Sequence, residues 1–340
     1  MQQVTTAEPT LAEPGSGRRR LPAALRSRRL VQLGPTIALV GVSILISAVN
    51  HRFLTLDNLR SIVTQSSIPL VLAVGLTFII LSGAIDLSIE GVMAMSSVIV
   101  SFLVLNNRTT LDWGLLGVVA AILVGGLAGF LNGFIHVTFR IPSFMVTLGM
   151  WSIGTGLATV LYRGLPVTVE DPMLRSWALG TTLSFSNLAW FAIGALVVGY
   201  LVQRFTLLGR YAYVIGGNED LARLSGVPVN RYKVMLFTFA GLCSGLAGVL
   251  IAARTGYGTA NVGAGTLFQV VTSVVVGGTA LTGGSGGVLQ TLVGVLFVTT
   301  LSNGMILMGI HPYIQQAVQG LLIIVAVALT MDRTRVPIIK

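Results

Sequence analysis

Charged residues are scarce in this chain: they make up 9% of 340 residues, whereas hydrophobic residues make up 54%. A soluble domain carries roughly 25% charged residues, because its surface has to be wetted. A soluble chain of this length would form two domains, and the charges present are too few to cover both surfaces. The composition therefore excludes a soluble protein and predicts a polytopic membrane protein.

Cysteine, lysine and histidine are also rare. The single cysteine, Cys243, cannot form an intramolecular disulfide. Neither lysine, Lys233 or Lys340, follows a G-x-x-x-x-G pattern, so the sequence has no phosphate-binding P-loop. The three histidines are scattered, and neither G-x-S-x-G nor H-E-x-x-H occurs. We therefore expect no catalytic site, no metal site and no ATPase site on this chain.

Apolar runs dominate what is present. A helix needs about 20 residues to cross the hydrocarbon core, and ten runs of about that length lie at 31–49, 61–82, 92–105, 115–137, 143–161, 188–203, 233–253, 267–282, 288–308 and 311–330. Two of them, 92–105 and 188–203, are short enough to be tilted, broken or re-entrant. The 41 glycines indicate close helix packing and deliberate helix breaks. The predicted fold class is all-α, a polytopic membrane bundle of about ten helices.

The distribution of positive charge predicts the topology. A net charge of +10 in a membrane chain normally marks cytoplasmic segments, not nucleic-acid binding. With ten spans and the N-terminus inside, 15 of the 21 lysines and arginines fall on the cytoplasmic side. We therefore expect a basic cytoplasmic arm at 1–30, a transmembrane domain at 31–330 and a cytoplasmic tail at 331–340. The protein would lie in the bacterial cytoplasmic (inner) membrane as a multi-pass protein, with lipid around the spans and both termini in the cytoplasm.

A hydrophilic connection on the expected cytoplasmic side, residues 204–232, contains the signals of a short capped helix. Asn218 is a preferred N-cap residue, since its side chain can accept from a free backbone N–H. Glu219 follows in the first turn, where negative charge suits the helix dipole. Gly226 can adopt the left-handed conformation that ends a helix. The pattern predicts a helix of about two turns between these residues.

Leu221 and Leu224 are spaced to share one face of this helix, with Arg223 beside them. So short a helix is marginal in isolation, and it therefore needs a surface to dock on. That surface is either a partner protein or the lipid headgroups, and the residues alone do not choose between them.

The segment 209–233 resembles the cytoplasmic coupling loop of permease subunits in ATP-binding cassette (ABC) sugar importers of the ribose/xylose/galactose type. Four other stretches are similar to the same family: GLTFIILSGAIDLSIEG (75–91), LAGFLNGFIHVTFRIPSFMVTLG (127–149), VVVGGTALTGGSGG (274–287) and LSNGMILMGI (301–310). The resemblance implies a ten-span permease paired with a second copy or a paralogous permease. It also implies two ATPase subunits that bind ATP and magnesium, an extracytoplasmic sugar-binding protein, and no cofactor on this chain. The helix Asn218–Gly226 would insert into a groove of the ATPase.

The predicted function is therefore translocation of a monosaccharide, a pentose or hexose, with ATP hydrolysed by a separate subunit. The alternative is a stand-alone, ion-coupled secondary transporter. Asp86 and Glu90 lie four residues apart between two apolar runs, where carboxylates can relay protons. A simpler interpretation is that Asp86 caps the helix after a glycine-hinged break, as the resemblance implies.

Three further sets of candidates follow from residue type and position. The residues assigned to helix breaks are Gly83, Asp86, Gly277, Gly278, Gly283 and Gly284. The polar or aromatic candidates for the translocation pathway, each of which could instead serve helix packing or interfacial anchoring, are Asn132, Thr147, Trp151 and Asn303. Arg163 and Arg175, on the expected outer side, are candidates for contact with a binding protein. Gln269 departs from the family, which often carries an acidic residue about eight positions before the glycine pair at 277–278.

Overall fold

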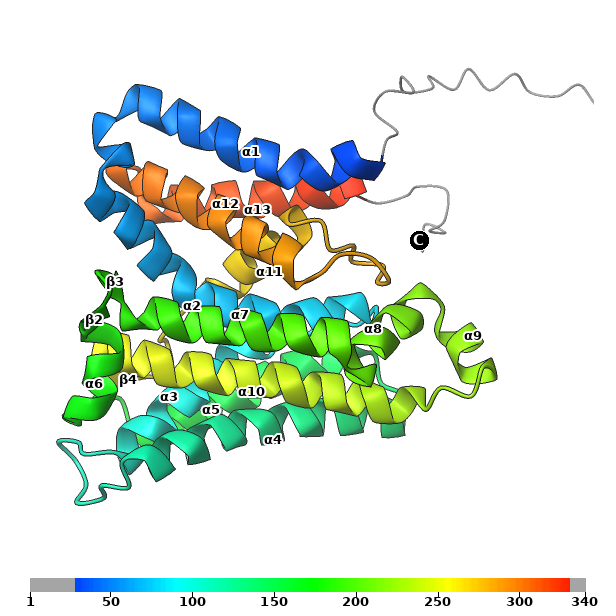
Figure 1. The fold of residues 1–340 in the computed structure, drawn as a ribbon. Coiled ribbons are helices and arrows are strands. Elements are labelled where there is room, and N and C mark those ends of the chain that lie inside the picture. Colours follow the sequence, from blue (N-terminus) through cyan, green and yellow to red (C-terminus); the bar gives the residue numbers. More distant parts are fainter. Residues whose placement is uncertain (1–27, 331–340) are drawn as a thin grey trace, which may run out of the picture. The chain divides into compact units, whose positions relative to one another are not determined.

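A computed structural model describes residues 28–330 (Figure 1). Most of the predicted arm at 1–30 and the whole predicted tail at 331–340 lie outside the described residues. The chain divides into two units at Gly34. Of the first unit the structure describes only the beginning of helix α1 (Arg28–Val49), and the second unit, from Pro35 onward, holds all the other elements.

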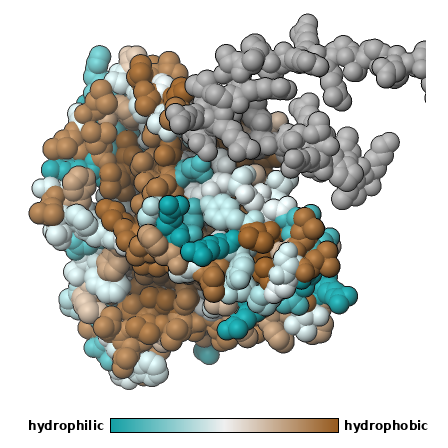
Figure 2. All heavy atoms as spheres, turned by 45° about the vertical axis from the view of Figure 1, so that its right-hand side comes forward, coloured by the Kyte–Doolittle hydropathy of each residue, from teal (hydrophilic) through white to brown (hydrophobic). Residues whose placement is uncertain are grey.

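Each of the ten predicted apolar runs overlaps a helix, which confirms the all-α membrane bundle. Besides α1 these helices are α2 (Leu56–Leu81), α3 (Ile89–Leu103), α4 (Leu115–Phe139), α5 (Ser143–Tyr162), α7 (Asn187–Phe205), α10 (Val229–Thr255), α11 (Thr266–Val276), α12 (Val288–Leu307) and α13 (Pro312–Thr330). Among the described residues, six helices are long and apolar enough to cross a membrane: α2, α4, α5, α7, α10 and α12. Hydrophobic side chains cover broad areas of the surface in Figure 2, as faces in contact with lipid require.

The prediction of a continuous apolar segment at 267–282 is wrong. Helix α11 has 11 residues and ends at Val276, so it rises only about 16 Å, half of what a bilayer requires. The glycine-rich segment that follows cannot continue the helix, because Gly278 has φ +103°. The run at 92–105 is short as expected, since α3 has 15 residues. The run at 188–203, also expected to be short, belongs to the 19-residue helix α7.

Short elements fill the two long connections. The expected cytoplasmic loop at 204–232 is mostly helical: it contains the end of α7, helix α8 (Leu207–Gly217), helix α9 (Glu219–Leu224) and the start of α10. The other connection holds helix α6 (Pro172–Leu179), which the sequence analysis missed although Asp171 caps it and Pro172 opens it. The remaining elements are the 3₁₀ turn η2 (His51–Leu54) and two antiparallel pairs, β1 (Val167–Thr168) with β4 (Tyr257–Gly258) and β2 (Thr181–Thr182) with β3 (Phe185–Ser186).

Helix α10 lies at the centre of the second unit and packs against α2, α3 and α4. Its approach to α4, which runs beside it (Figure 1), depends on glycine. A Cβ atom on Gly125 would lie 2.6 Å from both the carbonyl oxygen of Gly241 and the Cα of Gly245. Small residues at such a contact let two backbones touch, which is how helices pack closely without a hydrophobic driving force.

Candidate functional site

Helix α9, the predicted coupling helix, projects at one end of the bundle beyond α8 (Figure 1). It begins after Asn218, whose side-chain oxygen accepts from the backbone N–H of Leu221 at 3.0 Å. It ends before Gly226, which has φ +79°. The cap and the terminating glycine therefore lie where the sequence predicts them. The helix itself is slightly shorter than expected, with six residues.

The two leucines of α9 point away from the bundle. Leu221 is 60% exposed and Leu224 is 84% exposed. On the opposite side Ala222 is buried in a small cluster with Ile215 of α8 and Val229 of α10. Large apolar side chains exposed together at a polar end of a protein typically mark an interaction surface.

Glu219 fastens α9 to the bundle. Its Oε2 lies 2.6 Å from Nζ of Lys233 on α10, and its Oε1 lies 2.8 Å from Nη2 of Arg223. Burial raises the pKa of the Glu219 carboxyl, but hydrogen bonds and charge attraction from these two cations outweigh burial and hold the pKa below its usual range. The sequence analysis placed Lys233 at the start of the apolar run 233–253 and named no partner for Glu219. It therefore did not predict the ion pair between them.

Three glycine-containing segments meet beside the start of α9. The N–H of Gly284 donates to the carbonyl of Leu81 at 2.9 Å. A Cβ atom on Gly283 would lie 2.8 Å from the nitrogen of Gly83 and 2.9 Å from the Cα of Gly216. The end of α8, the break after α2 and the break after α11 therefore touch one another through their backbones. We call this contact the glycine junction.

The break between α2 and α3 is held by hydroxyl groups from α5. The N–H of Ile85 donates to Oγ of Ser143 at 3.1 Å, and the N–H of Leu87 donates to Oγ1 of Thr147 at 3.0 Å. Gly83 opens the break with φ +76°. A broken helix at membrane depth is tolerated only where neighbours satisfy its backbone, and these hydroxyls do so here.

Asp86 and Glu90 both have hydrogen-bonding partners in the chain. Asp86, 2% exposed, accepts from the N–H of Ser88 at 2.8 Å and from its hydroxyl at 2.6 Å. It therefore closes a turn just before α3, and the expected cap of the first helical turn is not formed. Glu90 accepts from the N–H of Leu267 at 3.2 Å, at the start of α11. Asp86 thus stabilises the turn before α3, and Glu90 links α3 to the start of α11.

The four candidate pathway residues do not form one site. Asn132 and Thr147 are fully buried at the first break, where Asn132 donates to the Ser88 hydroxyl at 2.9 Å. Trp151 is 39% exposed on α5. Asn303 is buried in α12, and its side-chain oxygen has no hydrogen bond within the described part of the chain. Two of the four therefore support the break.

Polar side chains from five helices instead converge on a cavity of about 260 Å³ that the sequence analysis did not predict. Those that matter for its chemistry are Gln65 on α2, Arg254 on α10, Gln269 on α11, Thr299 and Ser302 on α12, and Gln315 and Gln319 on α13. Glutamines in apolar spans were a signal in the sequence, but of these residues only Gln269 drew attention. Gln269 lies in the wall of this cavity, which we call the polar cavity.

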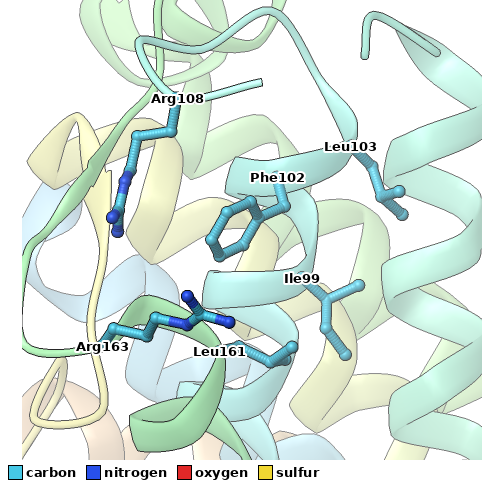
Figure 3. A pocket seen from close by; sticks show the side chains of 6 residues that line it. All are labelled: Ile99, Phe102, Leu103, Arg108, Leu161 and Arg163. Atoms are coloured by element: carbon cyan, nitrogen blue, oxygen red, sulfur yellow. The ribbon is translucent and has the colours of Figure 1, made fainter. Parts of the chain in front are cut away.

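At the end of the bundle opposite α9, two arginines lie around a second cavity, of about 420 Å³ (Figure 3). Arg163 is exposed at its rim, and Arg108 donates to the carbonyls of Tyr162 and Leu165 at 2.8 and 3.1 Å. Arg175, expected as a free surface contact, donates to the carbonyl of Ala253 at 2.7 Å and so holds the last turn of α10. Of the predicted pair, Arg163 is exposed, whereas Arg175 is half-buried and bonded to the chain.

Relatives of this chain are permease proteins. Residues 58–327 match the family described as branched-chain amino acid transport system / permease component. The chain is 35% identical to the "Probable ABC transporter permease protein YphD" of Escherichia coli (strain K12), over 88% of this chain and 90% of that protein. It is 33% identical to the ribose import permease protein RbsC of the same strain, over 88% and 93%. It is 32% identical to the L-arabinose ABC transporter permease protein AraH of Azospirillum brasilense, over 81% and 80%. No solved structure matches the chain.

Proposed function

The chain belongs to the branched-chain amino acid transport system / permease component family, and on that premise we propose that it is the membrane-spanning subunit of a binding-protein-dependent ABC importer for a monosaccharide. The relatives named for ribose and arabinose favour a pentose or hexose over the amino acids in the family's description. ATP and magnesium would be bound by separate ATPase subunits, because the sequence carries no P-loop.

Helix α9 is the observation that carries this proposal. It presents Leu221 and Leu224 outward while Ala222 and the Glu219–Lys233 ion pair hold it on the bundle. A rigidly mounted pair of apolar anchors suits a groove in a soluble partner, because buried anchors supply most of an interface's binding energy. A helix resting on lipid would need no ion pair to fix its position. The ATPase is the partner that an importer requires at this end.

The orientation follows from the same helix. If α9 faces the cytoplasm, so do the basic residues at its end of the bundle, Arg204, Arg210 and Arg231, as the positive-inside rule requires. The connection at 162–187 then faces outward, where Arg163 would meet acidic groups of an extracytoplasmic sugar-binding protein. Both termini would be cytoplasmic, and a second copy or a paralogous permease would complete the pathway.

The ion-coupled alternative has no structural support. A proton relay requires carboxylates that can exchange protons along a path. Asp86 is buried and bonded to Ser88, and Glu90 bonds to the backbone of Leu267. Both groups are used within the chain to hold helix ends.

The test is reconstitution. The chain is purified from its native host with the proteins that bind it and placed in proteoliposomes with labelled pentoses, hexoses and leucine. Uptake of a sugar that needs ATP, the ATPase and the binding protein is the expected result. Uptake driven by a proton gradient without the ATPase, or ATP-driven uptake of leucine alone, would contradict the proposal. Saturable ATP hydrolysis by the isolated chain would contradict the assignment of ATP to a partner.

A further inference from the structure

The polar cavity offers hydrogen bonds that the chain itself does not use. The side chains of Gln65 and Gln269 are half-buried in its wall, and neither makes a hydrogen bond within residues 28–330. Thr299, 1% exposed, also lines the cavity, and its Oγ1 has no partner within those residues. A buried hydroxyl is nearly always paired, so the unpaired Thr299 indicates a polar occupant of the cavity. The two accessible glutamine amides in the same wall offer that occupant further hydrogen bonds.

The other two glutamines are partly engaged and leave an acceptor free. Nε2 of Gln315 donates to the carbonyl of Ile310 at 2.9 Å, and Nε2 of Gln319 donates to the hydroxyl of Ser302 at 3.1 Å. These bonds fix the orientation of both amides. Since an amide offers both donors and an acceptor, the wall can match hydroxyl groups, which also donate and accept.

The lining of the cavity disfavours an amino acid as its occupant. Arg254 is the one charged side chain that lines the cavity among the described residues, and it is exposed, in the last turn of α10. An amino acid leaving water would need an opposite charge for its ammonium group as well as for its carboxylate. Glu90, the nearby acid, is bonded to the start of α11. A polyol needs no charged partner, and apolar residues such as Met93 and Ile251 in the same wall suit the C–H faces of a sugar ring.

The cavity extends from the middle of α12, at Thr299, toward the end of the bundle opposite α9, where Arg254 and Ile306 also line it. Helix α11 runs antiparallel to α12, with Gly277 against Gln290 and Ser273 against Gly294. Continued for one more turn, this register puts Gln269 level with about Val298, the middle of the 20-residue helix α12. Shortened helices that begin inside the membrane commonly form the substrate sites of transporters.

We propose that the polar cavity is a transient binding site for an uncharged monosaccharide on its way through the membrane, with Gln65, Gln269 and Thr299 contacting its hydroxyl groups. This assignment rests on the function proposed above. It gives Gln269, a neutral residue where the resembling family often has an acid, the role of a hydroxyl ligand. The binding protein supplies the affinity, so the cavity needs only a few hydrogen bonds.

The test replaces the amides with an apolar side chain of similar size, in the complete transporter in proteoliposomes. Gln65→Met and Gln269→Met should each lower the maximal ATP-driven uptake of the transported sugar by about fivefold, the effect of one lost hydrogen bond. Binding-protein-stimulated ATP hydrolysis should stay within about twofold of wild type. The matched control is Gln316→Met, because Gln316 is exposed on α13 and does not line the cavity. Wild-type uptake by both cavity variants overturns the site and leaves the proposed function intact.

A second measurement does not depend on how well those variants fold. Gln269→Cys in a Cys243→Ser background is modified with a membrane-permeant thiol reagent, with and without the transported sugar. The sugar should slow modification at position 269 at least about threefold, and it should leave Gln316→Cys unaffected. Equal rates at position 269 with and without sugar overturn the site. A wild-type complex that imports leucine and no sugar overturns the proposed function together with it.

Discussion

The Nζ atom of Lys233 lies 2.6 Å from Oε2 of Glu219, so one ion pair joins α9 to the first turns of α10. Lys233 is 8% exposed, which makes the pair unlike an ordinary surface salt bridge. Removing the carboxylate would leave a nearly buried ammonium group without a partner. The position of α9 therefore depends on a residue outside that helix.

The first prediction concerns this ion pair. Glu219→Gln should weaken binding of the ATPase by roughly 1–2 kcal/mol, less than for a fully buried pair because the carboxylate is partly exposed. Lys233→Met should have a smaller effect, since it leaves a carboxylate that still has Arg223 and water. Pull-down of the ATPase at graded concentrations measures both. Arg223→Ala is the control and should be mild, and a loss as large as that of Glu219→Gln would show that the pair does not hold the helix.

The second prediction concerns the exposed leucines. Leu224→Ala should cost about 2 kcal/mol or more in ATPase binding and should abolish transport, because truncated anchors dominate interface energies. Leu221, less exposed, should follow the same trend with a smaller loss. Membrane insertion should not change, since neither side chain packs in the bundle. Retention of both ATPase binding and sugar uptake by Leu224→Ala would mean that α9 rests on lipid.

Helix α9 was predictable because the residues that start and end it act over a few positions of the sequence. Asn218 acts on a residue three positions ahead, and Gly226 ends the helix by its own conformation. Helix α8 was missed although Gly209, Ala212 and Ile215 recur every three residues and form its buried face. The glycines of α8 hide this repeat of three. In a sequence a glycine is interpreted as the end of a helix, even where it lies inside a helix and lets another backbone approach.

The polar cavity could not be predicted, because its residues lie from position 65 to position 319. Periodicity assigns a residue to one face of its helix, but no local pattern says which faces of six helices line the same cavity. The same limit explains Asn132 and Thr147. A polar residue in a span can bond to the chain or to a passing solute. The distances to Leu87 and Ser88 show that Thr147 and the amide nitrogen of Asn132 bond to the chain, whereas Oδ1 of Asn132 has no partner within the described residues.

The third prediction separates the two arginines at the end opposite α9. Arg163→Ala should reduce the rate of sugar uptake several-fold at low ionic strength and less in high salt, because exposed charges act through screened attraction to the binding protein. Insertion and thermal stability should stay unchanged. Arg175→Ala should lower the free energy of unfolding by about 1–3 kcal/mol, since it removes the hydrogen bond from a charged guanidinium to the carbonyl of Ala253. Equal salt dependence of uptake for wild type and Arg163→Ala would contradict a role in docking.

The last prediction concerns the glycine junction. Gly216 lies near the end of α8, just before α9. A Cβ atom on Gly216 would collide with the carbonyl oxygen of Leu81 and would lie 2.6 Å from the nitrogen of Gly284. Gly217, its neighbour, has open space where a Cβ atom would go. The two positions thus form a matched pair in one helix: an added methyl group at Gly216 would collide with both helix breaks, and one at Gly217 would meet neither.

Gly216→Ala should therefore force α8 away from both breaks, at a cost of about 1–3 kcal/mol for an overpacked contact. If movement of the ATPase reaches the polar cavity through this junction, the variant should still bind the ATPase through Leu224, yet ATP hydrolysis should no longer drive sugar uptake. Gly217→Ala should behave like wild type in both assays. The ratio of sugar imported to ATP hydrolysed, measured in proteoliposomes, distinguishes loss of coupling from loss of folding. An unchanged ratio in Gly216→Ala would show that the ATPase acts on the helix breaks by another route, most directly through Lys233 and α10.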